Sequence, residues 1–135
     1  MTSNMAGVWF VISLALVQYF YFVMAVGAAR GKTKIAAPAV SGHPDFERAY
    51  RVQMNTLEQL IIFIPAILCF GRFVSERWAV IFGLVFILGR LLYSIGYRKA
   101  AEKRSWGFLI STLPLLILLV GGLIYAGLEA YRVGI

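Results

Sequence analysis

This sequence begins with its longest stretch free of acidic and basic side chains: no Asp, Glu, Lys or Arg occurs from Met1 to Ala29. A helix needs about 20 apolar residues to cross the hydrocarbon core of a bilayer, and this stretch is longer. Residues 1–5 also lack the basic charge that a secretory signal peptide carries at its start. We therefore expect a retained membrane-spanning helix here.

The overall composition excludes most classes of soluble protein. Hydrophobic residues make up 61% of the 135 residues and charged residues 14%, against roughly 45–50% and about 25% in soluble domains. So few charged side chains are too few to give a soluble enzyme of this size a polar surface. Cys69 is the single cysteine, which excludes an internal disulfide framework or a cysteine-based metal site, and we expect no metal.

Three further apolar segments follow the first. We predict an all-α fold, an integral membrane four-helix bundle formed by residues 1–135 as a single domain, with spans at about residues 8–29, 45–72, 76–98 and 105–131. Asp45 suits the N-cap of the second span. Only residues 59–71 of that span are free of charge, so its charged first half is expected to face protein or water rather than lipid.

Basic residues gather on one side of the predicted bundle. Loop one with the start of the second span, and loop three, hold Arg30, Lys32, Lys34, Arg48, Arg51, Arg98, Lys99, Lys103 and Arg104, whereas the opposite side holds Arg72, Arg77 and Arg132. The positive-inside rule then places loops one and three in the cytoplasm and both termini on the opposite side. The net charge of +7 thus reflects orientation and contact with anionic lipid, and we expect no nucleic-acid partner.

Polar side chains in the second and third spans each fall on one face of a helix. The two sets are Arg51, Asn55 and Glu58, and Arg90, Tyr93 and Tyr97. Spacings of three and four residues place each set on a single face, in the cytoplasmic half of the bundle. An unpaired charge inside a bilayer costs a few kcal/mol or more, so these groups must bind one another or a ligand.

Two explanations for these polar faces remain open from the residues alone. The first is a buried Glu58–Arg90 ion pair that locks the bundle. The second is a small zwitterionic ligand with carboxylates and an amine, because guanidinium groups bind carboxylates and Glu58 can accept from an ammonium group. A locking pair needs only two residues, whereas the faces together hold about six, which favours the ligand.

The same residues carry a resemblance to a known family. Glu47, Arg48, Arg51, Asn55 and Glu58 resemble the E-R-x-x-R-x-x-x-N-x-x-E signature of MAPEG proteins, the membrane-associated proteins in eicosanoid and glutathione metabolism. Residues 90–97 resemble the R-x-x-Y-x-x-x-Y stretch on the third helix of that family. The resemblance covers the four-helix length. It implies a homotrimer that binds glutathione between neighbouring subunits, towards the cytoplasmic side.

The resemblance also implies roles for individual residues. The glutathione-binding set is Arg30, Arg51, Gln53, Asn55, Glu58, Arg90, Tyr93 and Tyr97, supported structurally by Glu47 and Arg48. Arg104 resembles the arginine that faces the glutathione thiol in the transferase and synthase branches, which makes it the implied catalytic residue. A thiol with a pKa of about 8.5 is mostly protonated at neutral pH, and a guanidinium within roughly 4–6 Å can lower that pKa by about 1–3 units.

The implied function is that of a membrane-bound glutathione transferase. Glutathione, as substrate or cofactor, would add to a lipophilic electrophile or reduce a lipid hydroperoxide, in detoxification or eicosanoid metabolism. Gly31 and Gln59 stand where the cysteinyl-leukotriene synthase branch has an arginine and a tyrosine, which favours a broader transferase. A prostaglandin E synthase-like isomerase, suggested by Arg104-Ser105, and a non-catalytic lipid-binding relative remain alternatives.

Overall fold

The computed structural model describes residues 3–135, and all regular structure in that part of the chain is helical. The elements are α1 (Ala6–Thr33), α2 (Pro44–Phe73), α3 (Glu76–Lys99), the short 3-10 helix η1 (Ala101–Arg104) and α4 (Ser105–Arg132). Each of the four long helices has the length and apolar composition to cross a membrane. The prediction of an all-helical chain with four potential spans is therefore confirmed.

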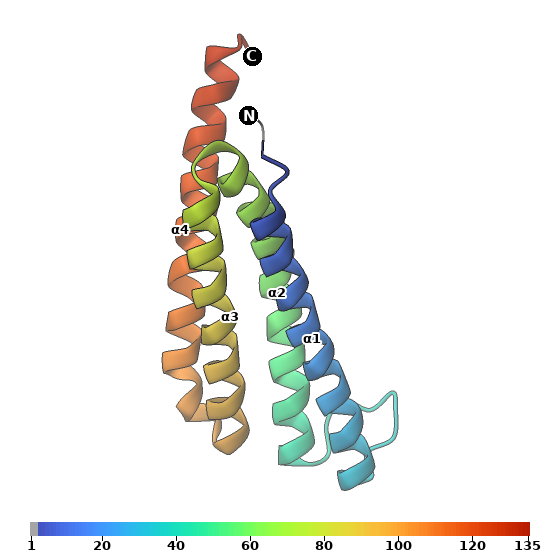
Figure 1. The fold of residues 1–135 in the computed structure, drawn as a ribbon. Helices are drawn as coiled ribbons and strands as arrows, with labels where there is room; N and C mark the ends of the chain where they lie inside the picture. Colours follow the sequence, from blue (N-terminus) through green and yellow to red (C-terminus); the bar gives the residue numbers. More distant parts are fainter. Residues whose placement is uncertain (1–2) are drawn as a thin grey trace.

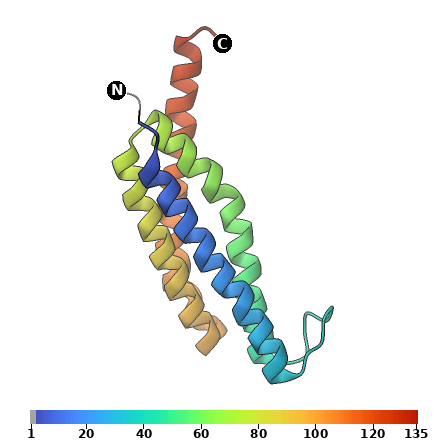
Figure 2. The same cartoon turned by 45° about the vertical axis from the view of Figure 1, so that its right-hand side comes forward.

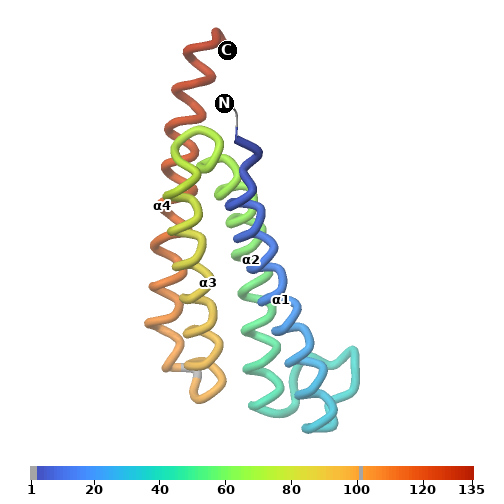
Figure 3. Tube along the Cα trace, viewed as in Figure 1, coloured from blue at the N-terminus to red at the C-terminus, as the bar shows by residue number. Residues whose placement is uncertain are grey.

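Successive helices run in opposite directions along the bundle (Figure 1). The α1–α2 loop and η1 lie at one end, which we call the basic end because it carries the two loops rich in Lys and Arg. The α2–α3 turn and the C-terminus lie at the other end, as the tube in Figure 3 also shows. Towards the basic end, the α1–α2 pair diverges from the α3–α4 pair (Figures 1 and 2).

Two helix boundaries differ from the sequence-based expectation. Helix α1 continues about one turn beyond Ala29 to Thr33, because basic side chains are favourable beside the carbonyl groups of a helix C-terminus. At the start of α2, His43 rather than Asp45 is the N-cap: its Nδ1 accepts a hydrogen bond from the Asp45 backbone N–H at 3.1 Å. Pro44 occupies the first helical position, where its missing N–H costs nothing.

The core consists of apolar side chains between the four helices, and it lies mainly in the half of the bundle away from the basic end. Phe63 of α2 and Phe86 of α3 are fully buried and stack with ring centroids 4.1 Å apart. Many large apolar side chains instead face outward, among them Phe10, Val17 and Leu123. An outer surface of this kind suits lipid, in which apolar side chains need no cover.

Helices α3 and α4 approach each other backbone to backbone at two glycines. A Cβ atom at Gly107 would overlap the backbone of Tyr93, and one at Gly89 would overlap the backbone of Ser111. Neither contact leaves room for a side chain, so each requires glycine. This close approach brings the start of α4, with Arg104 just before it, against the face of α3 that carries the tyrosines.

Candidate functional site

Arg90 lies at the centre of a polar cluster inside the bundle, and its side chain is completely buried. Its Nη2 donates hydrogen bonds to Asn55 Oδ1 and Thr56 Oγ1 of α2, both at 2.8 Å. Its Nη1 donates to Gln59 Oε1 at 3.2 Å and to Ser111 Oγ of α4 at 3.5 Å. Neutral amides and hydroxyls from two helices therefore hold this guanidinium.

The alternative of a buried Glu58–Arg90 ion pair is wrong in this structure. Glu58 is exposed, and both terminal nitrogens of Arg90 donate to the neutral side chains just described. The reason is helix geometry: Thr56 and Gln59 are buried on the face of α2 turned towards Arg90, whereas Glu58 lies at the edge of that face. Sequence reasoning missed three neutral partners, Thr56, Gln59 and Ser111, which no charge pattern marks.

A polar cavity of about 410 Å³ opens beside this cluster, near the basic end. Its lining residues come from α2, α3 and η1, and they are Arg51, Met54, Asn55, Glu58, Tyr93, Tyr97 and Arg104. Six residues predicted for glutathione binding or catalysis thus line one cavity in a single chain. The seventh lining residue, Met54, was not predicted, because its position in the motif is variable and its side chain is apolar.

Arg104 is held close to the aromatic side chains of α3. Its guanidinium lies 5.6 Å from the centroid of the Tyr97 ring, and the Tyr97 and Tyr93 rings are 5.5 Å apart. On the other side, the Arg90 guanidinium lies 4.2 Å from the centroid of the Tyr93 ring. A guanidinium over an aromatic face is attracted by the π electrons of the ring, so the two arginines and two tyrosines form one connected row.

A second cavity of about 520 Å³ continues from the first and shares Asn55, Tyr93 and Arg104 with it. We call it the apolar cavity, because Phe108 and Leu109 of α4 line it, together with Ser105. The lining of the polar cavity suits a charged ligand, and the lining of the apolar cavity suits an apolar ligand. Arg104 lines both cavities, so its guanidinium could contact a ligand in either one.

Three residues of the predicted glutathione-binding set line neither cavity of a single chain. Arg90 lies in the buried cluster described above, and Arg30 and Gln53 make contacts elsewhere. Arg30 donates to the backbone oxygens of Ile35 and Ala39, at 3.4 and 2.7 Å. Gln53 donates to the Tyr19 hydroxyl at 3.2 Å, on the side of α2 that faces α1. Neither side chain therefore reaches the polar cavity within its own chain.

The two residues expected to support the site structurally make local contacts at the start of α2. Glu47 accepts a hydrogen bond from the Gly42 backbone N–H at 3.2 Å, and Arg48 lies 4.0 Å from Asp45. The first contact fastens the α1–α2 loop to the helix, and the second lies within the first turns of α2. Within residues 3–135, no three His, Cys, Asp or Glu side chains come together in a way that could hold a metal ion.

Comparisons with known proteins agree on one family. The MAPEG family model matches residues 8–124. The chain is 46% identical over 114 residues to an uncharacterized protein of Synechocystis sp., covering 84% of this chain and 83% of that protein. It is 45% identical over 108 residues to microsomal glutathione S-transferase 2 of Homo sapiens, covering 78% and 74%. It is also 37% identical over 84 residues to leukotriene C4 synthase of Bos taurus, covering 62% and 56%.

Proposed function

Since the chain belongs to the MAPEG family, we propose that it is a membrane-bound glutathione transferase, in which Arg104 stabilises the glutathione thiolate for attack on a lipophilic electrophile. The observation that carries this proposal is the position of Arg104 at the junction of the polar and apolar cavities. The water-soluble tripeptide and the membrane-soluble acceptor would meet at that junction.

The side chains of the polar cavity match the charges of glutathione. The tripeptide carries two carboxylates and one ammonium group, and the cavity offers cations, a carboxylate, an amide and two phenols. Arg51 can bind a carboxylate through its planar fork, and Glu58 can accept from the ammonium group. Arg90 lies behind this lining and acts through Asn55 and Tyr93, which it orients.

Arg104 would act electrostatically. A guanidinium stays protonated in proteins, so it cannot serve as the base that removes the thiol proton, and that proton leaves to water. The thiolate sulfur then forms a bond to the electrophilic carbon while a halide departs, or while an epoxide C–O bond opens and its oxygen takes a proton from water. The Arg104 guanidinium would already lie beside the sulfur, so no reorganisation of the site would be needed to stabilise the thiolate during the reaction.

The proposed assembly is a homotrimer whose sites lie between subunits. Its support is that Arg30 and Gln53 lie outside the cavities of their own chain, so a neighbour is needed to bring them to glutathione.

We also place the basic end in the cytoplasm and both termini opposite, following the distribution of Lys and Arg. A cysteine at Lys34 in a Cys69→Ala background should then resist an impermeant thiol reagent from outside.

Conjugation of a dinitrohalobenzene by detergent-purified protein tests the proposed function. Arg104→Ala should lower kcat/KM by about 100-fold or more, the usual effect of removing a group that stabilises developing charge. Lys103→Ala is the matched control, because it removes a neighbouring exposed cation and should stay within about twofold of wild type. Equal rates for Arg104→Ala and wild type would reject the assigned role, and no conjugation by wild type would favour a non-catalytic lipid-binding protein.

A second candidate function is a glutathione-dependent isomerase. Ser105 lines the apolar cavity directly after Arg104, where its hydroxyl could donate to an oxygen of the acceptor. A lipid endoperoxide converted without net consumption of glutathione, at a rate that falls in Ser105→Ala, would favour this candidate. Glutathione consumed in step with product would favour the transferase.

A further inference from the structure

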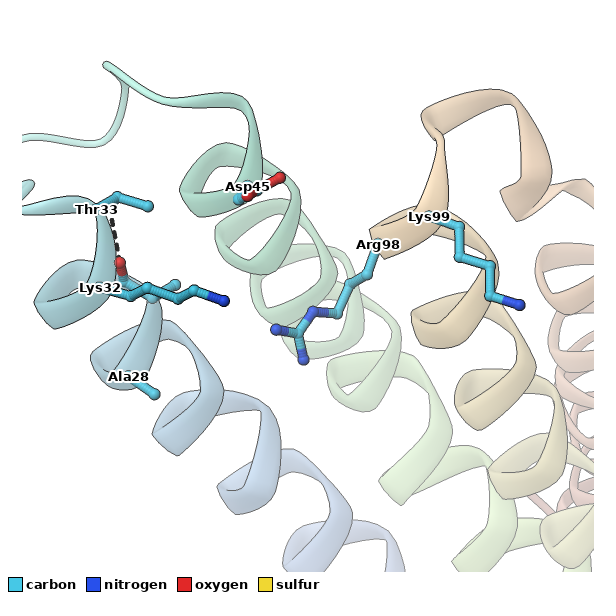
Figure 4. A pocket seen from close by; sticks show the side chains of 7 residues that line it. Ala28, Lys32, Thr33, Asp45, Arg98 and Lys99 are labelled. Atoms are coloured by element: carbon cyan, nitrogen blue, oxygen red, sulfur yellow. Dashed lines mark hydrogen bonds between the residues drawn. The ribbon is translucent and has the colours of Figure 1, made fainter.

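A third cavity lies at the basic end and shares no lining residue with the polar or the apolar cavity. It has a volume of about 390 Å³ and lies between the C-terminal turns of α1 and α3 and the first turn of α2. Its polar lining includes Lys32, Arg98, Lys99 and Asp45 (Figure 4). We call it the basic cavity, and the function proposed above does not use it.

The cations of this cavity form no ion pair within residues 3–135. The ion pairs among residues 3–135 are Arg48–Asp45 and Arg132–Glu129, and neither involves Lys32 or Arg98. Figure 4 shows the Lys32 and Arg98 side chains extending from facing helices towards each other. Both side chains are exposed, and like charges repel, so an anion between them would stabilise this arrangement.

The position of the cavity along the bundle indicates which anion that is. Helix α1 has 28 residues and is therefore about 42 Å long, whereas the hydrocarbon core of a bilayer is about 30 Å thick. Lys32 and Arg98 lie in the last turns of their helices, so they lie at the level of the lipid headgroups. Ala28 and Ala29 line the wall one turn deeper, where a headgroup would continue into its glycerol and acyl part.

We propose that the basic cavity binds the phosphate of an anionic phospholipid headgroup, held between Lys32 and Arg98. A guanidinium and an ammonium group both donate to phosphate oxygens, and basic pockets between membrane helices recognise such headgroups. Asp45 lies in the same cavity and opposes the anion, so it limits the affinity. The bound lipid would join the ends of α1 and α3, which diverge at this end of the bundle (Figure 1).

Lipid binding to the full-length, detergent-purified protein, measured by native mass spectrometry, tests this proposal. Phosphatidylglycerol and phosphatidylcholine of the same acyl composition are the two probes. Wild type should prefer phosphatidylglycerol, and Lys32→Gln/Arg98→Gln should bind it about tenfold more weakly because two cations near the headgroup are lost. The control Arg72→Gln/Arg77→Gln removes the same charge at the opposite end and should keep wild-type affinity. Equal loss in both double variants, or no loss in either, would overturn the proposal.

A second variant changes the affinity in the other direction. Asp45→Asn removes the opposing carboxylate, so phosphatidylglycerol should bind more tightly by about threefold to tenfold. Unchanged or weaker binding would overturn the proposed position of the phosphate. Inorganic phosphate distinguishes the source of the ligand: if millimolar phosphate displaces the lipid, the cavity binds a soluble phosphate ester, and the lipid assignment is wrong. Retained lipid under those conditions supports it.

Discussion

The residue that organises the candidate site is Arg90, which need not touch a ligand to do so. It is a positive charge inside the bundle, and side chains of α2 and α4 accept hydrogen bonds from both of its terminal nitrogens without any carboxylate. Its bond to Asn55 and its contact with the Tyr93 ring fix two residues that line both cavities. Arg90, which is buried inside the bundle, therefore fixes the positions of two side chains that line the cavities.

Replacement of this arginine should affect both stability and binding. Arg90→Met leaves the amides and hydroxyls of the cluster without their donor, which costs about 1–3 kcal/mol for each buried polar group left unsatisfied. We expect a lower thermal midpoint in detergent and weaker glutathione binding, measured by thermal unfolding and calorimetry. Arg104→Ala is the comparison and should keep the thermal midpoint of wild type. An Arg90→Met protein with wild-type stability would contradict the role of the cluster.

At the scale of elements, the contact between α3 and α4 determines where Arg104 lies. Gly107 lets the first turn of α4 lie directly on the backbone of α3 beside Tyr93. Gly96 does the same for η1, because a Cβ atom there would overlap the Lys103 carbonyl oxygen. Arg104 lies between these two contacts, so its distance from the tyrosines depends on how closely the helices pack.

A methyl group at the first of these contacts should separate the helices. Gly107→Ala forces α4 away from Tyr93, so we expect a lower thermal midpoint and at least about a tenfold loss of conjugation rate from a misplaced Arg104. Gly127→Ala is the matched control, because it lies in the same helix with no atom within 4 Å of the added methyl. It should be neutral or stabilising by about 0.5–1 kcal/mol. Equal effects of the two substitutions would contradict the packing argument.

Sequence patterns predicted the helices far better than they predicted the contacts between them. The charge-free runs mark each apolar span, but they do not show that α1 continues to Thr33, because Arg30 and Lys32 are equally suited to a loop and to a last helical turn. Helical spacing predicted which charged residues share a face. It could not identify Thr56 or Ser111 as partners of Arg90, because neutral side chains in apolar spans give no periodic signal.

At the scale of the whole molecule, the polar cavity of a single chain lacks some of the residues predicted to bind glutathione. One chain supplies six of the nine predicted residues to the cavity and holds Arg90 in the buried cluster, whereas Arg30 and Gln53 lie elsewhere. A closed assembly of identical subunits would repeat the same contact at each boundary. The trimer proposed above would therefore form each site from the cavity of one subunit and the α1–α2 face of its neighbour.

Mixed oligomers test this arrangement. Arg30→Gln and Arg104→Ala should each lose most conjugation activity alone, whereas each mixed trimer should regain about a third of its sites with both arginines intact. The measurement is the specific activity of co-expressed, doubly tagged protein. Activity no higher than the average of the two single variants would show that both arginines act within one chain or that the oligomer does not form.

The central claim is that Arg104 stabilises a glutathione thiolate, and ultraviolet stopped-flow absorbance measures that species directly. When purified protein is mixed with glutathione, we expect a thiolate signal that saturates with glutathione, persists in Lys103→Ala and disappears in Arg104→Ala. Its pH midpoint should lie about 1–3 units below the ordinary thiol pKa of about 8.5. Glutathione binding without any thiolate signal, or the same signal in Arg104→Ala, would contradict the account.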